Sequence, residues 1–155
     1  MGKVVKRSEI KKLAQKYKEK NKTIAFTNGC FDILHIGHVR YLKESKKTAD
    51  ILIVGLNSDA SVKKIKGDSR PINNEIERAE LLAELNSVDF VVVFDENSPS
   101  DLIDEIKPNV YTKGADYTLE TLPEKDVVLK NNIKMEFIKF TEGKSTTNIL
   151  KALNN

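Results

Sequence analysis

Residues 27–38 read TNGCFDILHIGH, and this stretch decides the fold class of the chain. An apolar run precedes it and an amphipathic run follows it, which predicts a strand, a glycine-containing turn and a helix. The first turn of that helix carries His35 and His38. Free backbone N–H groups at a helix start bind phosphate, and two imidazoles add further donors. Gly37 has no side chain, so a phosphate can approach the backbone closely.

The composition limits the class of protein. The chain has 155 residues, 26 basic and 23 acidic side chains, and a formal net charge of +3. This length predicts one domain, and the near balance of charge does not favour a nucleic-acid partner. The single cysteine, Cys30, excludes an internal disulfide and suits a reducing cytoplasm. No apolar run approaches the roughly 18 residues that span a bilayer, and the N-terminus lacks a signal-peptide core.

Strand-like and helix-like segments alternate along the chain. An N-terminal helix over residues 8–20 is expected within an extension, residues 1–22, that precedes the main domain, residues 23–155. The predicted strands cover residues 23–27, 50–56, 89–94, 109–113 and 134–140, and the further predicted helices cover 38–47, 74–86, 100–106, 123–130 and 146–153. Such alternation predicts an α/β, Rossmann-like fold, in which helices cover both faces of a five-stranded parallel sheet. Ligands of such sheets bind at the carboxyl ends of the strands, where the strand order reverses.

Residues 143–147, GKSTT, form a second candidate phosphate site. They look like the end of a P-loop, but Ile138 stands where a P-loop requires its first glycine, which excludes that motif. A loop entering the last helix is the better interpretation. Ser145, Thr146 and Thr147 then offer hydroxyls beside free N–H groups. One hydroxyl could cap the helix while the others bind phosphate.

Charged side chains after the predicted strands form a third set of candidates. Residues 61–73 are expected to be an irregular, lid-like loop that carries Lys66 and Arg70, and either side chain could hold phosphate. The alternative interpretation is that this run of charges is simply a solvent-exposed surface without a ligand. Asp32 could orient the preceding turn or the metal shell of an acceptor phosphate, and Asp59 could contact a ligand or cap a helix.

Together these motifs resemble the HxGH nucleotidyltransferase superfamily, which includes cytidylyltransferases, pantetheine-phosphate adenylyltransferase and class I aminoacyl-tRNA synthetases. The likeness runs from about residue 23 to 153 and is strongest toward the adenylyltransferases that make ADP-heptose. It is carried by residues 27–38, 57–60 with 66–71, 113–117 and 143–148. Glycerol-3-phosphate cytidylyltransferases look similar but have Arg in place of Phe140, Lys in place of Asn148, and Gly-Asp-Asp-Trp in place of residues 114–117.

The resemblance implies transfer of AMP from ATP to D-glycero-β-D-manno-heptose 1-phosphate, with pyrophosphate as the second product. The implied catalytic residues are His35, His38 and Lys66. The implied nucleotide-binding residues are Asn28, Gly29, Cys30, Phe31, His35, Gly37, His38, Lys66, Arg70, Gly114, Asp116, Gly143, Ser145, Thr146 and Thr147. The implied acceptor-binding residues are Asp32, Asn57, Arg78 and Lys113.

The sequence contains no His/Cys/Asp metal cage, so Mg²⁺ is expected to arrive on the triphosphate of ATP. The expected partners are ATP, a sugar 1-phosphate and a second copy of the chain in a homodimer, with no nucleic acid and no membrane. Alternatives are a cytidylyltransferase for a polyol phosphate such as glycerol 3-phosphate, an FAD-synthetase-like adenylyltransferase, a nucleotide-binding regulator without turnover, and a structural module. The intact histidine pair and hydroxyl loop argue against the last two.

Overall fold

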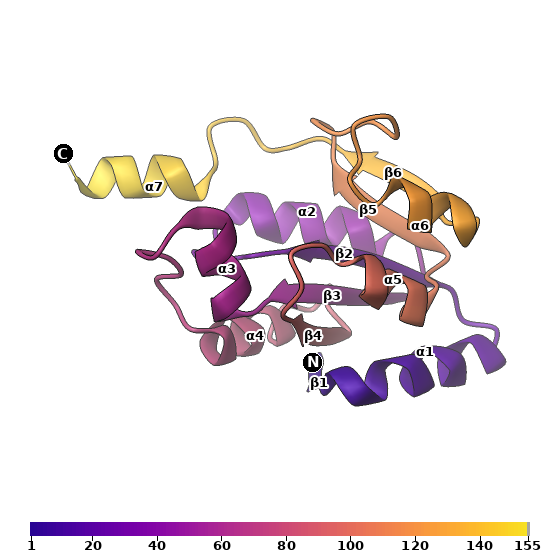
Figure 1. The fold of residues 1–155 in the computed structure, drawn as a ribbon. Helices are drawn as coiled ribbons and strands as arrows, with labels where there is room; N and C mark the ends of the chain where they lie inside the picture. The colour runs from indigo at the N-terminus through magenta and orange to yellow at the C-terminus, as the bar shows by residue number, and fades with distance from the viewer. Residues whose placement is uncertain (155) are drawn as a thin grey trace.

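A computed structural model describes residues 1–154 of the chain. Its strands form one parallel sheet in the order β1-β4-β3-β2-β5-β6 (Figure 1). The strands are β1 (Lys3–Val5), β2 (Ile24–Gly29), β3 (Ile51–Asn57), β4 (Phe90–Phe94), β5 (Val110–Gly114) and β6 (Lys134–Ile138). The helices are α1 (Ile10–Glu19), α2 (Ile36–Lys46), α3 (Asp59–Lys66), α4 (Glu75–Ala83), α5 (Ser100–Ile106), α6 (Lys125–Lys130) and α7 (Thr146–Leu153). The predicted parallel α/β architecture is confirmed.

The predicted number of five strands is wrong, because β1 adds a sixth strand at the edge of the sheet. Lys3, Val4 and Val5 pair in parallel with β4. Three residues are too few to show a period of two, so the segment carries no strand signal of its own. Its conformation comes from pairing with β4, which the sequence pattern does not reveal.

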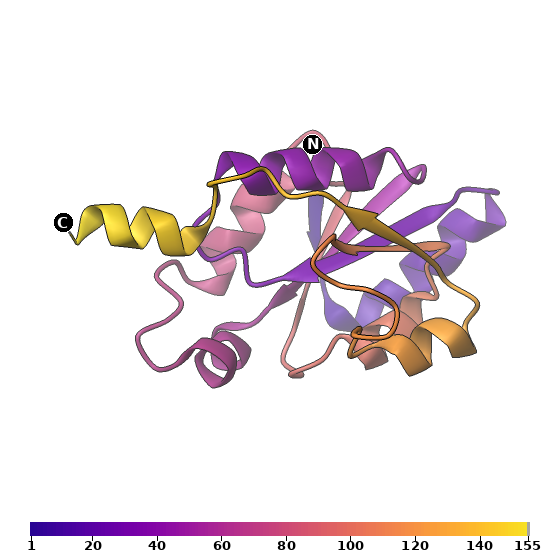
Figure 2. The ribbon, with the colours of Figure 1, turned by 90° about the horizontal axis from the view of Figure 1, so that it is seen from above.

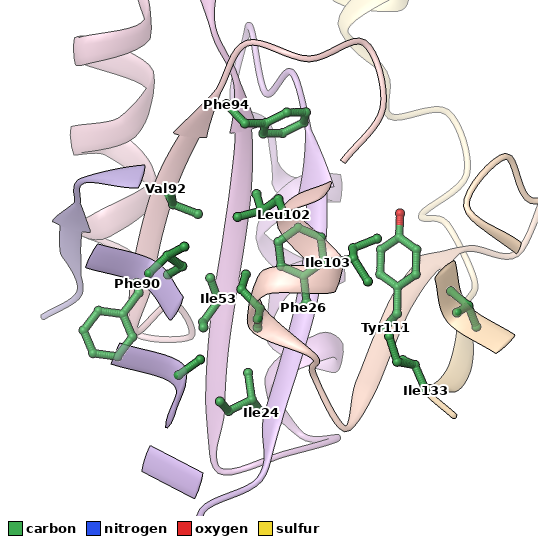
Figure 3. Packing of buried hydrophobic residues seen from close by; sticks show 14 of the residues in the cluster. Ile24, Phe26, Ile53, Phe90, Val92, Phe94, Leu102, Ile103, Tyr111 and Ile133 are labelled. Atoms are coloured by element: carbon green, nitrogen blue, oxygen red, sulfur yellow. The ribbon is translucent and has the colours of Figure 1, made fainter. Parts of the chain in front are cut away.

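Helices cover both faces of the sheet (Figure 2). On one face, α1, α5 and α6 contribute buried residues to a core cluster with Phe26 of β2, Ile53 of β3 and Tyr111 of β5 (Figure 3). On the other face, α2 and α4 contribute Leu42 and Leu82 to a second cluster. Each fully buried side chain of this size contributes about 1.5–3 kcal/mol to folding relative to an exposed one. The predicted two-faced packing follows from the apolar character of the central strands.

The strand order reverses between β2 and β5. β2 pairs with β3 on one side and with β5 on the other. The chain reaches β3 and β4 through α2 and α4, and it reaches β5 and β6 through α5 and α6 on the opposite face. Loops that leave β2 and β5 therefore diverge, and such a divergence leaves room for a ligand at the strand ends.

Two local expectations are corrected. The first half of residues 61–73 is helical, because α3 runs to Lys66. Ser58 caps this helix, with its Oγ accepting a hydrogen bond from the Ser61 backbone at 3.2 Å, so Asp59 is not the cap. The N-terminal helix begins later than expected: Ser8 lies in a 3-10 turn, and no side chain caps α1. Within residues 1–154, no helix combines the length and apolarity that crossing a membrane requires.

Candidate active site

A cleft of about 560 Å³ opens at the carboxyl ends of β2 and β5, where the strand order reverses. The residues that the sequence had singled out along its wall are Asn28, Gly29, Cys30, Phe31, Asp32, His38, Asn57, Lys66, Lys113, Gly114 and Thr146. The wall also contains Phe140, for which the sequence left open a surface for a purine ring or a place in the core. The other wall residues, to which sequence reasoning assigned no site role, are Tyr41, Ile65, Asn97, Ser98, Pro99, Tyr117, Pro123 and Glu124. The sequence therefore located the cleft but identified only part of its wall.

The two histidines form a stacked pair at the start of α2. His35 is the N-cap residue, and its Nδ1 accepts a hydrogen bond from the Gly37 backbone at 3.1 Å. The Nδ1 of His38 accepts from the His35 backbone at 3.4 Å, and the ring centroids lie 3.8 Å apart. Because Nδ1 is an acceptor in both rings, each neutral ring carries its hydrogen on Nε2. The fold thereby provides two Nε2–H donors side by side at a helix N-terminus.

Both imidazoles are neutral at neutral pH. Burial lowers the pKa of His38 to about 4, and the nearby charges of His35 and Lys66 act in the same direction. Burial also lowers the pKa of His35, with the Lys144 ammonium adding to the effect. The site therefore offers directional donors to an anion rather than two fixed positive charges.

His38 is expected to make folding sensitive to acid. Its pKa in the folded protein lies below the ordinary value of 6.5, so between about pH 6.5 and pH 4 the unfolded chain binds the extra proton and the folded chain does not. The free energy of unfolding should accordingly fall as the pH drops through this window. Proton NMR of the ring Cε1–H should give a His38 midpoint near 4. A midpoint near 6.5 would contradict the buried, neutral assignment, and a His38→Asn variant identifies the resonance.

Gly37 and the C-terminal loop of residues 143–147 lie together beside the cleft, and of these residues Thr146 lines its wall. A Cβ at Gly37 would lie 2.8 Å from Cε1 of His35, so the capping position of that ring requires glycine. The same Cβ would lie 3.4 Å from Cβ of Lys144, which places residues 143–147 against the start of α2. Thr146 donates from Oγ1 to the Ile33 carbonyl at 3.4 Å. The two motifs that the sequence separates by about a hundred residues therefore lie together.

The rest of the C-terminal motif starts α7. Ser145 caps the helix, with its Oγ accepting from the Asn148 backbone at 3.1 Å. Thr147 is exposed in the first turn, and Gly143 adopts a positive φ of 70° in the turn before it. Figures 1 and 2 show α7 projecting away from the sheet, and none of its residues is buried. One hydroxyl therefore caps the helix, and those of Thr146 and Thr147 are not used as caps.

Asp32 joins two loops. Its buried carboxylate accepts hydrogen bonds from Arg70 and from the Ile72 and Asn73 backbones, the latter two at 2.7 and 3.2 Å. Burial alone would raise the pKa of Asp32, but these hydrogen bonds outweigh burial and lower it. The oxygens are thus engaged in holding residues 70–73. Arg70 Nη2 is buried and has no hydrogen-bond partner within residues 1–154, and Arg70 is not among the residues that line the cleft.

Arg78 lies beneath the cleft, where only 1% of its surface is exposed. Its Nε donates to the Asn73 carbonyl, its Nη1 to the carbonyls of Cys30 and Asn57, and its Nη2 to Asp59, at 2.6–2.9 Å. Every nitrogen of the guanidinium is therefore used by the protein. In this structure the side chain positions the loops that form the cleft floor, and the acceptor-binding role expected for Arg78 stays a prediction.

Cys30 and Lys66 lie near the histidine pair. Burial raises the pKa of Cys30, although the positive charges of Lys66 and Arg78 oppose the rise, so the side chain is a neutral thiol. A neutral thiol is a poor nucleophile, which agrees with the expected non-covalent role. Lys66 is the last residue of α3 and is exposed at the cleft wall. Its ammonium is close enough to influence the pKa of His38.

Phe140 forms an apolar surface at the β6 end of the cleft. β6 ends at Ile138, and Phe140 is 60% exposed, so it is not a core residue. Its ring lies parallel to that of Tyr41 on α2, with centroids 6.5 Å apart. A Cβ at Gly114 would lie only 2.0 Å from the Phe140 ring and 2.7 Å from Oδ1 of Asp116. Glycine at position 114 therefore allows the aromatic ring to lie over the end of β5.

Lys113 lies on the other side of the β5 end. Its Nζ is 4.8 Å from the ring centroid of Tyr117 and 5.7 Å from that of Tyr111. Burial lowers the pKa of Lys113, and the carboxylate of Glu124 opposes this change. The Tyr111 hydroxyl, which points out of the core in Figure 3, donates to Asn28 Oδ1 at 2.6 Å. The strand ends thus combine a cation with aromatic surfaces.

Known proteins resemble this chain in sequence. Residues 26–152 match the family described as Cytidylyltransferase-like. The chain belongs to this family. It is therefore a nucleotidyltransferase, as the sequence motifs predict. The "Bifunctional protein HldE" of Syntrophotalea carbinolica is 46% identical over 152 residues, and that of Aliarcobacter butzleri is 52% identical over 145 residues.

These alignments cover 98% and 94% of the chain but only 31% and 30% of the two relatives, so the chain spans about a third of their length. Among solved structures, the lipopolysaccharide core biosynthesis protein from Thermoplasma volcanium is 32% identical, with a TM-score of 0.63. That alignment covers 79% of this chain and 99% of the matched chain.

Proposed function

We propose that this nucleotidyltransferase transfers AMP from ATP to a sugar 1-phosphate, with D-glycero-β-D-manno-heptose 1-phosphate as the preferred acceptor. The observation that carries the proposal is the pair of Nε2–H donors of His35 and His38 beside the hydroxyl loop of residues 143–147. The sequence resemblance to ADP-heptose-forming adenylyltransferases and the likeness to the HldE proteins support the choice of acceptor.

The reaction is an in-line displacement at the α-phosphorus of ATP. An oxygen of the acceptor phosphate forms the new P–O bond, the bond to the β-phosphate oxygen breaks, and pyrophosphate leaves. The acceptor phosphate is already a nucleophile, so no general base is required, and positioning with electrostatic stabilisation does most of the work. His35 and His38 donate to oxygens of the α- and β-phosphates. Lys66, at the cleft wall, stabilises the negative charge on the leaving group, and Arg70 is assigned a supporting role from the next loop.

Mg²⁺ enters as part of the nucleotide substrate. No group of three or more His, Cys, Asp or Glu side chains within residues 1–154 is arranged to hold a metal ion. The carboxylate of Asp32, which lies nearest to the histidine motif in sequence, is engaged by Arg70 and two backbone N–H groups. We expect triphosphate oxygens and water to supply the oxygen ligands that Mg²⁺ prefers.

A matrix of nucleoside triphosphates against acceptor phosphates, read by pyrophosphate release, tests the proposal. We expect the largest kcat/KM for ATP with the heptose 1-phosphate, and loss of turnover on addition of EDTA. The acceptors include glycerol 3-phosphate and FMN. A larger value for CTP with glycerol 3-phosphate would assign the chain as a polyol-phosphate cytidylyltransferase, and one for ATP with FMN as an FAD-synthetase-like enzyme. Nucleotide binding without any pyrophosphate release would assign a regulator.

A further inference from the structure

Glu124 is a buried carboxylate with no role in the fold. It lies just before α6, lines the cleft and is 4% exposed. Its Oε2 is fully buried, and within residues 1–154 no group donates a hydrogen bond to it. The Tyr111 hydroxyl lies close enough to Glu124 for this side chain to help burial raise the pKa of Tyr111, but the hydrogen of this hydroxyl is donated to Asn28 Oδ1 at 2.6 Å. An unpaired buried carboxylate oxygen is costly, so a persistent one in a cleft wall indicates a missing ligand.

The position of Glu124 separates it from the phosphate-binding groups. The histidine pair starts α2, which covers one face of the sheet, and Phe140 stacks on Tyr41 of the same helix. Glu124 precedes α6, which covers the opposite face together with α5 (Figure 2). The cleft runs over the strand ends from one face to the other. If the nucleotide occupies the side of His38 and Phe140, Glu124 faces the acceptor.

The surroundings of Glu124 define the chemistry of the ligand. Lys113 is close enough for its charge and that of Glu124 to influence each other, yet no ion pair joins them within 4 Å. A carboxylate accepts hydrogen bonds and a neighbouring ammonium donates them. A ligand hydroxyl can do both, so it can bind to the two groups at once. Tyr117, Pro99 and Pro123 add apolar surface to the same wall, which suits the C–H face of a sugar ring.

We propose that Glu124 binds ring hydroxyls of the acceptor and thereby selects a sugar phosphate over acceptors that lack these hydroxyls. This inference rests on the proposed function, because it assigns the acceptor end of the same cleft. It makes Glu124 a specificity-determining residue, and Lys113 its cationic neighbour. Neither the histidine pair nor the hydroxyl loop contributes to this end of the cleft.

The first test is Glu124→Gln, which keeps the side-chain volume and removes the charge. We expect KM for the heptose 1-phosphate to rise about 10- to 100-fold, the range for a lost hydrogen bond to a charged group. KM for ATP, and its Kd by calorimetry, should stay within about twofold. The matched control is Glu120→Gln on the same loop, an exposed residue paired with Lys125, which should leave all constants unchanged. An unchanged acceptor KM, or a raised ATP Kd, would overturn the inference.

The core of the second test uses wild-type enzyme only and stands even if Glu124→Gln fails to fold, and the variant, where it folds, adds a comparison. Wild-type enzyme is assayed with a series of monodeoxy acceptor analogues. At least one deoxy position should lower kcat/KM by about 10- to 100-fold, and Glu124→Gln should show little further loss with that analogue. Equal kcat/KM across the series would overturn the inference. Should the nucleotide–acceptor matrix reveal turnover only with an acceptor that has no such hydroxyls, both the inference and the sugar-phosphate assignment fail. If sugar phosphates are turned over but all deoxy analogues have equal kcat/KM, only the inference about Glu124 fails, and the sugar-phosphate assignment stands.

Discussion

Replacing His38 by Asn should lower kcat by about 10²–10³ while the fold is retained. The amide oxygen of Asn can take the place of Nδ1 as acceptor for the His35 backbone, so the start of α2 is preserved. The Nε2–H donor that faces the phosphates is lost. The same reasoning applies to His35→Asn, because Asn is also a good N-cap residue. Steady-state kinetics with far-UV circular dichroism of each variant would measure the effect.

Glutamine provides the complementary variant. Its longer amide places an N–H group near the position of Nε2, so His38→Gln should recover part of the turnover that His38→Asn loses. Arg40→Ala, at an exposed position of the same helix, is the control and should behave as wild type. Near wild-type kcat in a folded His38→Asn protein would remove the catalytic assignment. Equal losses in the Asn and Gln variants would mean that the imidazole acts by some property other than its Nε2–H.

ATP should be preferred to CTP by about 10- to 100-fold in kcat/KM, with the same sugar phosphate as acceptor. The phosphate-binding groups read no base, so selection has to come from the wall near Phe140. The exposed ring of Phe140, which stacks on the ring of Tyr41, favours the larger purine base. Stacking of a base on an aromatic side chain contributes about 1–3 kcal/mol. No guanidinium stands at this position to donate to a pyrimidine carbonyl.

Phe140→Arg tests the origin of this preference. It should reduce the ATP/CTP ratio at least about tenfold, because it removes the stacking surface and introduces directional donors. Phe140→Tyr keeps the ring and should retain the ratio. A wild-type ratio at or below one would overturn the adenylyltransferase assignment and favour a cytidylyltransferase.

The sequence predicted the parts of the fold that have strong local periodicity. β2, β3 and β4 contain continuous apolar runs. α4 starts after the capping residue Asn74 and has an apolar stripe on one side and charged residues on the other. The motif around His35 predicted a strand, turn and helix, which the structure confirms. By contrast, β1 is defined by its pairing with β4, and α3 is obscured by its lysines despite a capping Ser58. A local sequence pattern does not show which distant strand a segment pairs with.

The residues of the candidate site also fall into those that the sequence predicted and those that it did not. The glycine, histidine and hydroxyl motifs that the sequence singled out lie together in the structure, and phosphate chemistry constrains the residue types and spacing of such motifs. The sequence did not show that Arg78 and Asp32 hold loops, since a charged residue near a cleft can bind a ligand or a loop, and the loop contacts appear only in the hydrogen-bond partners. Glu124 carried a weak signal at most. Its neighbours in sequence are also charged, and its burial depends on how α6 packs.

The pairing of β1 with β4 also bears on how the chain tolerates shortening. The family match begins at residue 26, yet Lys3–Val5 shield one edge of β4, and Ile10 of α1 is fully buried against the sheet. A version trimmed to the matched segment would leave the backbone of Phe90–Phe94 open at a hydrophobic sheet edge, which is a template for aggregation. The smallest unit that remains dispersed in water thus begins well before the segment that family likeness defines.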